Sequence, residues 1–386
     1  MIDPLERLGT ELWARDDLRA GTKRTPDGYR SHALFAAGGV VLMLPTGRRR
    51  AAAESMVRWT DATTAPELFL RATGWSAARI GLLPGVVRRR VDVRSHRAAI
   101  EDPVTLHEYL AEACGVPEVD LSVAFGSERP NRKPIVRVHT PDGRTVGFAK
   151  VGWNEFTNEL VTQEGRTLRQ LQRFPTRRLV LPRVLHLGSW QGHAVSVTTP
   201  LVGSPTWTRP AAPNRETFRE LARLGDVTEH TVSQSPRVAG YLARRSVLDA
   251  DVAELVTRAV ERADVLGGDR PFPHGRFHGD FTPWNVRSTG RGLIVWDWER
   301  TDDGVPVGYD VLHFHFQRAL GRTGPGGSGD ALVGVIRDHG TMLRELGVPD
   351  PSALGLLYGI ELQYRFAGIT TIGWLPGLLE TLVASS

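Results

Sequence analysis

The stretch from His278 to Glu299 constrains this chain more than any other part of it. It reads HGDFTPWN from His278 to Asn285 and, after a strand–turn–strand pattern, WDWE from Trp296 to Glu299. The spacing H-x-D-x-x-x-x-N, followed by a second aspartate beyond a turn, is what phosphoryl transfer from a nucleotide requires. One carboxylate must hold the acceptor hydroxyl, while an amide and another carboxylate hold the metal ions that bridge the phosphates. The stretch therefore predicts a phosphotransfer site.

The spacing also assigns a role to each polar residue. Asp280 is expected to accept or orient the proton of the attacking hydroxyl. Positions 285 and 297 are symmetric about residue 291, so a hairpin between them would carry Asn285 and Asp297 to the same open end. Amide and carboxylate oxygens suit Mg²⁺. His278 is expected to brace the loop, with a direct part in catalysis as the alternative.

The residues around this motif carry weaker expectations. Trp284, Trp296 and Trp298 are expected to pack and exclude water rather than to stack on a ligand. Glu299 is placed to reach either the metal or a substrate group. The sequence does not decide between these two roles.

A lysine far upstream is the expected phosphate ligand. Lysine occurs only three times among 48 basic residues, so a surviving lysine is one that arginine does not replace. Lys150 ends a predicted strand, where it can reach the α- and β-phosphates if a carboxylate holds it. In the helix that follows, Glu164 shares the apolar face whereas Glu159 lies on the solvent face. Because an unpaired buried charge is costly, we expect Lys150 to pair with Glu164.

Other nucleotide contacts have weaker signals. No G-x-G-x-x-G follows the first strand of this region. Gly126 and Ser127 are candidates to donate to phosphate. Thr198, Thr199 and Leu201 belong to an extended linker whose main-chain groups are expected to bond an adenine ring.

The overall composition indicates the cellular compartment and argues against some classes of partner. The 386 residues include a single cysteine, Cys114, so an internal disulfide is impossible, and this fits a reducing compartment. The N-terminus has no basic region followed by an apolar core, and no apolar run is long enough to span a bilayer. A net charge of +5 is modest for this length and is no nucleic-acid footprint by itself. We expect a cytoplasmic protein without a nucleic-acid or membrane partner.

The order of predicted elements indicates an α+β class in three parts. Residues 1–104 are expected to form an N-terminal α/β accessory extension that serves substrate docking or extends the next lobe. Residues 105–200 alternate strands, among them one over 179–187, with one long helix and are expected to form a small β-rich N-lobe. Residues 201–386 are expected to form a mostly helical C-lobe with the catalytic loop and the acceptor site.

These residues resemble the aminoglycoside phosphotransferase and choline kinase group of the protein-kinase-like fold. The resemblance rests on HGDxxxxN and WDWE, on glycine rather than arginine between His278 and Asp280, and on the lack of a full Gly-rich loop. It covers roughly residues 105–386. It implies ATP or GTP as donor, Asp280 as catalytic base, Mg²⁺ on Asn285 and Asp297, and Lys150 with Glu164 on the phosphates. It also implies that Asp310 braces the C-terminal lobe.

The acceptor stays open at this point. The first hypothesis is a hydroxyl of a small molecule such as an aminoglycoside, a sugar or an amino alcohol. Residues 299–386 carry ten acids and six bases, which favours a cationic acceptor. The second is a Ser/Thr kinase acting on a peptide or protein, which a sheet edge within residues 30–45 would favour. The third is a non-catalytic nucleotide-binding module. It is disfavoured because a degenerate module need not keep all five polar residues of the proposed site, which are Lys150, Glu164, Asp280, Asn285 and Asp297.

Overall fold

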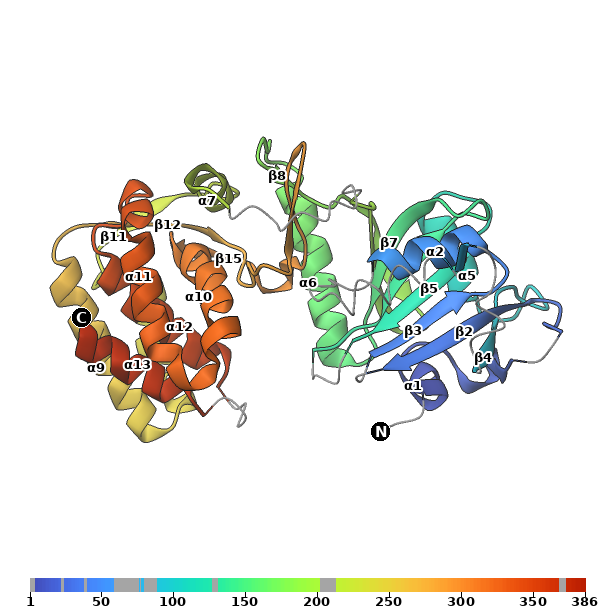
Figure 1. The fold of residues 1–386 in the computed structure, drawn as a ribbon, viewed down its shortest axis with the longest axis horizontal. Helices are drawn as coiled ribbons and strands as arrows, with labels where there is room; N and C mark the ends of the chain where they lie inside the picture. Colours follow the sequence, from blue (N-terminus) through green and yellow to red (C-terminus); the bar gives the residue numbers. More distant parts are fainter. Residues whose placement is uncertain are drawn as a thin grey trace. The chain divides into compact units, whose positions relative to one another are not determined.

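The computed structural model describes residues 4–21, 24–37, 40–58, 76, 78–79, 89–126, 131–201, 213–367 and 373–386. The chain divides into two compact units (Figure 1). Unit 1 contains Met1–Gln172 and Pro182–Val202, and unit 2 contains Arg173–Leu181 and Gly203–Ser386. In the described part of the chain, no helix is both long and apolar enough to cross a lipid bilayer.

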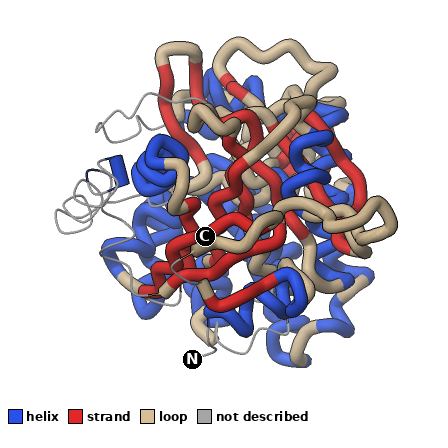
Figure 2. The backbone as a smooth tube through the Cα atoms, turned by 90° about the vertical axis from the view of Figure 1, so that its right-hand side faces the viewer, coloured by secondary structure: helices blue, strands red, loops and turns tan. Residues whose placement is uncertain are grey.

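Unit 1 is built on one antiparallel sheet of nine strands in the order β1-β4-β2-β3-β5-β6-β7-β10-β9. Its strands are β1 (Leu18–Ala20), β2 (Tyr29–Ala37), β3 (Val40–Pro45), β4 (Arg90–Arg94), β5 (Asp120–Phe125), β6 (Ile135–His139), β7 (Thr145–Val151), β9 (Val184–Trp190) and β10 (His193–Thr198). Its helices are α1 (Pro4–Glu11), α2 (Arg49–Arg58), α5 (Leu106–Ala113) and α6 (Glu155–Leu171), with a 3-10 turn η1 at Arg15–Asp17. Figure 2 distinguishes helices, strands and loops of the described chain by colour.

The first strands and the later ones share this sheet. β3 pairs with β5 through Val41↔Phe125 and Met43↔Val123, which joins the N-terminal strands to those beyond residue 105. Buried Val123, Val136 and Val195 belong to the same apolar core as Met43. The N-terminal strands therefore continue the sheet that carries Lys150. The part they play in substrate docking remains a prediction.

The long helix α6 begins and faces as its sequence dictates. Asn154 caps its start by accepting from the backbone N–H of Thr157 at 2.8 Å, and the Thr157 side chain bonds back to the cap. The predicted apolar face is confirmed, because Glu164, Leu168 and Leu171 are buried and Leu160 is partly buried.

One predicted strand is wrong. The sequence suggested a single strand over 179–187 that completes the N-lobe sheet. The chain instead forms β8 (Leu179–Val180), breaks at Pro182, and resumes as β9. Proline cannot donate to a ladder, which explains the break. β8 pairs in parallel with β14 (Gly292–Val295) and so belongs to unit 2.

Unit 2 is mostly helical. Its helices are α7 (Arg215–Ala222), α8 (Pro236–Ala243), α9 (Ala250–Gly267), α10 (Tyr309–Thr323), α11 (Ser328–Glu345), α12 (Pro351–Arg365) and α13 (Leu375–Ser385), with 3-10 turns η2 (Arg245–Val247), η3 (Trp298–Arg300) and η4 (Pro325–Gly327). α12 packs against α9, α11 and α13, and α11 packs against α10 (Figure 1). The predicted helical character of this part is confirmed.

Two small sheets complete unit 2 and hold the catalytic motif. One has the order β11-β12-β15, from β11 (Thr228–His230), β12 (Phe272–Phe277) and β15 (Asp302–Pro306). The other has the order β13-β14-β8, with β13 at Val286–Thr289. The loop from His278 to Asn285 runs between these sheets, so both of its ends are anchored in strands.

Candidate active site

The catalytic loop turns at Gly279. This residue has φ +84°, and a Cβ placed there would lie 2.2 Å from the carbonyl oxygen of Arg300. Any other residue would be strained in its backbone and would also clash with a main-chain atom. The glycine between His278 and Asp280 is therefore a steric requirement of this loop.

His278 braces the loop from inside. It is fully buried, its Nδ1 accepts from the backbone N–H of Asp280 at 3.1 Å, and its Nε2 donates to the carbonyl of Trp296 at 3.1 Å. Burial lowers its pKa to about 4, so the ring is neutral at pH 7, as this pattern of one acceptor and one donor requires. This geometry is that of a brace, and a direct part for His278 in catalysis remains a prediction.

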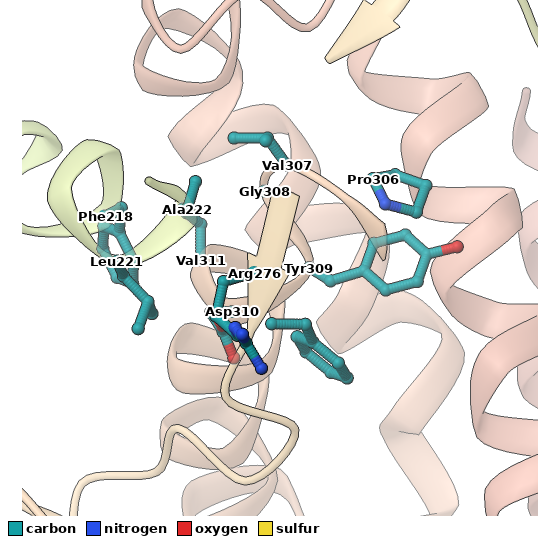
Figure 3. A pocket seen from close by; sticks show the side chains of 11 residues that line it. Phe218, Leu221, Ala222, Arg276, Pro306, Val307, Gly308, Tyr309, Asp310 and Val311 are labelled. Carbon is teal, nitrogen blue, oxygen red and sulfur yellow. The ribbon is translucent and has the colours of Figure 1, made fainter. Parts of the chain in front are cut away.

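Asp310 holds the same loop from the start of α10. Its Oδ2 accepts from the backbone N–H of His278 at 2.9 Å. Burial raises the pKa of Asp310 to about 7, against the lowering effect of backbone hydrogen bonds. A cavity of about 10 Å³ lies beside it, lined by Phe218 and Leu221 from α7 and by Arg276 from β12 among others (Figure 3). That volume is close to the minimum for one water molecule, so the space carries no ligand site.

The carboxylate of Asp280 is held through both oxygens. Asn285 Nδ2 donates to its Oδ2 at 2.8 Å, and Arg365 donates to its Oδ1 at 2.8 Å. His313 Nε2 lies 3.4 Å from the same Oδ1. Burial by itself raises the pKa of Asp280, but the His313 hydrogen bond and the Arg365 charge outweigh it and hold the pKa well below its usual range. The group is therefore an ionised carboxylate of fixed orientation, one quarter exposed.

The predicted hairpin exists, but its register differs by one residue from the prediction. β13 pairs with β14 from Val286↔Val295 to Thr289↔Gly292, so the turn is centred between residues 290 and 291. The backbone N–H of Trp296, rather than that of Asp297, donates to the carbonyl of Asn285 at 3.2 Å. The two-residue turn explains the offset, because the prediction centred it on residue 291. Asp297 follows directly beyond the pair.

Asp297 has an unusual backbone. Its φ of 69° and ψ of 58° are left-handed, and Gln191 is the other described non-glycine residue with a positive φ. Such a conformation costs free energy and is typical of functional sites. The charges of Asp280 and Asp297 both act on buried His278, so the two carboxylates lie in one electrostatic neighbourhood.

The tryptophans of this region differ in exposure. Trp298 is fully buried and donates to the carbonyl of Val295 at 3.1 Å. Its ring meets the His278 ring edge-on, with 4.4 Å between the two ring centroids. This confirms its packing role. Trp284 is 50% exposed, so the expectation that it packs away from solvent is wrong. A proline precedes it in a loop, where no periodicity reports burial.

Unit 1 contains the predicted lysine–glutamate pair. Lys150 Nζ lies 2.8 Å from Glu164 Oε1 and 2.7 Å from Oε2. The face of β7 that carries Lys150 is half-buried, whereas Gly147, Ala149 and Val151 point into the core. Glu164 is buried and Glu159 is exposed, so helical periodicity identified the correct partner.

The other nucleotide-binding candidates are less well defined. Thr198 ends β10, and its hydroxyl donates to the carbonyl of Phe148 at 3.4 Å. Thr199 donates its backbone N–H to the carbonyl of Arg183 at 2.8 Å, so that donor is already engaged. Leu201 is half-buried. Ser127 lies outside the described residues.

Sequence reasoning missed two residues that contact Asp280. Arg365 lies at the end of α12 and is separated from Asp280 by 85 residues, while His313 lies on α10, separated by 33. Neither belongs to the local motif. The one available signal was general, since a mostly buried carboxylate requires a cationic or hydrogen-bonding partner.

Comparisons with known proteins bear on the family and on the fold of this chain. The family described as "Phosphotransferase enzyme family" matches residues 154–327, a segment that contains Glu164, Asp280, Asn285 and Asp297. No curated protein gives a significant match. The fold resembles a thermostable variant of aminoglycoside phosphotransferase APH(4)-Ia solved with AMP-PNP and hygromycin B, at TM-score 0.50 and 19% identity, covering 73% of this chain and 98% of that one.

Two further solved structures show weaker likeness. A choline/ethanolamine kinase family protein from Mesorhizobium loti has TM-score 0.38 and 18% identity, with 72% of this chain and 93% of that one covered. A putative fructosamine-3-kinase from Haemophilus somnus 129PT has TM-score 0.41 and 11% identity, with 72% and 95% covered.

The family match and the fold together indicate a phosphotransferase with a protein-kinase-like fold. Residues 154–327 carry the pattern of the phosphotransferase enzyme family, which confirms the predicted resemblance and the predicted class of enzyme. The α+β fold class is confirmed as well.

Proposed function

We propose that this protein transfers the γ-phosphoryl group of ATP to a hydroxyl group of a small molecule, with Asp280 as the catalytic base. The observation that carries the proposal is the fixed, ionised carboxylate of Asp280, to which Asn285 of the same motif donates at 2.8 Å. Such a group orients the attacking hydroxyl and takes its proton as the new bond forms. The partners of Asp280 leave it one quarter exposed, so an acceptor can reach it.

Asn285 and Asp297 are the proposed Mg²⁺ ligands. Because the Asn285 amide nitrogen is bonded to Asp280, the amide oxygen is the atom that remains to face a cation. An amide oxygen and a half-buried carboxylate form a hard oxygen set that fits Mg²⁺. The ion would neutralise charge on the phosphates.

Lys150 and Glu164 are proposed to serve the nucleotide. The bidentate contact with Glu164 fixes the Lys150 ammonium at the end of β7, where it would pair with the α- and β-phosphates. Thr198, Thr199 and Leu201 are proposed to contact the base, and Ser127 a phosphate. GTP is the alternative donor.

A small-molecule acceptor is favoured over a peptide. The peptide hypothesis called for a free sheet edge within residues 30–45, but β2 lies between β4 and β3, and β3 lies between β2 and β5. The edges of the described sheet are β1, with three residues, and β9. Strand addition at residues 30–45 would therefore require breaking existing pairs.

The charge of the acceptor is not set by the acids of the second unit. Of the ten acids from Glu299 onward, six pair with arginines. These are Asp302, Asp303, Asp338, Glu345, Asp350 and Glu361. Most of their negative charge is offset by these arginines, so the acid count gives little support to a cationic acceptor.

The proposal is tested by a turnover screen. The full chain is incubated with Mg²⁺ and ATP or GTP, and with aminoglycosides, sugars, amino alcohols and Ser/Thr peptides in turn. We expect nucleotide-dependent product with a mass gain of about 80 Da, the mass of one phosphoryl group, on a small molecule. If only a peptide is phosphorylated, the acceptor is a peptide rather than a small molecule. Nucleotide binding without any turnover would favour the non-catalytic module. A cytoplasmic location without nucleic-acid or membrane partners is part of the same proposal.

A further inference from the structure

Arg365 contacts the catalytic loop at two adjacent residues. Its Nη2 donates to Asp280 Oδ1 at 2.8 Å, and its Nη1 donates to the main-chain carbonyl of Gly279. One planar guanidinium therefore fixes both the side chain of Asp280 and the backbone immediately before it. A lysine ammonium has no such fork of donors and would not span both acceptors with the same geometry.

Arg365 is placed by a helix outside the motif. It is the last residue of α12, a helix whose residues are mostly buried against α9, α11 and α13. Its side chain is 9% exposed. A largely buried ion pair is weak evidence for stability, because desolvation offsets the attraction of the charges. What the contact does provide is a fixed direction for the carboxylate.

The same helix reaches Asp280 by a second path. The hydroxyl of Tyr358 donates to His313 Nδ1 at 2.7 Å, and His313 Nε2 faces Asp280 Oδ1 at 3.4 Å. Tyr358 and Arg365 are seven residues apart, about two helical turns, so they lie on one face of α12. Oδ1 is thus held directly by Arg365 and indirectly by Tyr358 through His313.

We propose that Arg365 is a positioning residue that fixes the Asp280 carboxylate in the orientation that meets the acceptor hydroxyl. The inference rests on the proposed function of Asp280 as base. Arg365 acts on the acceptor side of the reaction, so its loss lowers kcat and leaves the KM for ATP unchanged.

The test compares Arg365→Ala with Arg337→Ala, whose arginine lies on α11 with a side chain that is 79% exposed. Turnover is measured as ADP release with ATP alone, where water is the acceptor, and with the acceptor found in the screen. We expect Arg365→Ala to lose about 100-fold in kcat, the scale of a misplaced catalytic group, with the KM for ATP within about twofold. Millimolar guanidinium chloride is expected to restore part of the lost turnover, whereas Arg337→Ala keeps native kinetics.

Tyr358→Phe is the second variant. It keeps the buried aromatic ring and removes only the Tyr358 hydroxyl that donates to His313. It therefore remains informative even if Arg365→Ala does not fold. We expect a smaller loss of kcat than for Arg365→Ala, again with the KM for ATP unchanged. Unchanged or increased kcat in both variants overturns the inference, and so does a rise in the KM for ATP with kcat preserved.

Asp280→Asn separates the two proposals. If Asp280→Asn keeps near-native turnover, the proposed role of Asp280 is wrong and the inference falls with it. If Asp280→Asn is inactive while Arg365→Ala and Tyr358→Phe turn over normally, only the role of Arg365 is wrong.

Discussion

Asn285 donates its side-chain amide to Asp280 twice, to the main-chain carbonyl at 2.9 Å and to the carboxylate at 2.8 Å. The motif therefore locks its own acid in place before any distant residue contributes. It also commits the amide nitrogen of Asn285, so that the oxygen is the atom offered to a cation. This relationship ties the proposed base and a proposed metal ligand into one rigid unit.

Replacing the proposed base is expected to abolish turnover. Asp280→Asn keeps the size of the side chain but cannot take the acceptor proton, and we expect kcat to fall by about 1,000-fold, within the range for loss of a general base. ADP release measures the change, with nucleotide affinity from calorimetry as the check on folding. Asp338→Asn is the matched control, since Asp338 is exposed on α11 and its carboxylate pairs with its neighbour Arg337. Equal kinetics for the two variants would contradict the assignment.

Removing the partner of Lys150 is expected to weaken nucleotide binding. Glu164→Gln removes the charge that holds the Lys150 ammonium at 2.7 Å. We expect the Kd for Mg·ATP to rise by about 10- to 100-fold, the scale of a lost hydrogen bond to a charged group. Titration calorimetry measures it. Glu159→Gln changes an exposed glutamate of the same helix and should bind nucleotide normally; weakening in both variants would point to a general effect on α6.

The metal role of Asp297 is tested by charge removal at constant backbone. Asparagine tolerates the left-handed conformation that Asp297 adopts, so Asp297→Asn changes the ligand without straining the chain. We expect the variant to bind ATP equally with and without Mg²⁺, whereas the native protein binds more tightly with Mg²⁺. Calorimetry in Mg²⁺ and in EDTA provides the comparison. A native Mg²⁺ dependence in Asp297→Asn would remove this residue from the metal site.

A methyl group on Gly279 is expected to disrupt the loop. Gly279→Ala combines a positive φ with a Cβ that would lie 2.2 Å from the Arg300 carbonyl oxygen. We expect the free energy of unfolding to fall by at least about 2 kcal/mol in total, which is more than the positive φ alone would cost. Turnover is expected to be lost as well. Urea unfolding measures the first quantity. Gly290→Ala adds a methyl group where no atom lies within 4 Å, and a similar loss there would refute the steric explanation.

Acid is expected to destabilise the second unit through its buried histidines. His274 donates to the Phe272 carbonyl at 2.8 Å and faces the Ser235 hydroxyl at 2.9 Å, and burial lowers its pKa to about 4. The unfolded chain takes up this proton near pH 6.5, so the free energy of unfolding falls as pH drops from about 6.5 towards 4. At higher pH the group has no effect.

His274→Asn isolates that contribution. Between pH 7 and pH 5 the variant should lose about 1–2 kcal/mol less of its free energy of unfolding than the native protein does. Urea unfolding at both pH values, followed by tryptophan fluorescence, gives the difference. Gln234→Asn, at an exposed and non-ionisable position of the same unit, should reproduce the native pH dependence. If His274→Asn also showed the native pH dependence, protonation of His274 would not contribute to the loss of stability in acid.

Local patterns in the sequence were enough to predict the local structure of the site. Alternation along β7 and helical periodicity along α6 identified Lys150 and Glu164 as a pair, and their contact is observed. The turn signals between Val286 and Val295 predicted the hairpin, although they placed its centre half a residue too late. These predictions succeed because burial periodicity and turn chemistry are properties of short segments.

Which distant segments meet became visible in the folded chain alone. It brought Arg365 and His313 to Asp280, moved β8 from the first sheet to β14, and exposed Trp284. Such contacts depend on how α10 and α12 pack. No local sequence pattern predicts that Arg365 contacts Asp280, because 85 positions separate them. The motif therefore contains the proposed reacting groups and one of the contacts that hold Asp280, while the packing of α12 adds the contact from Arg365.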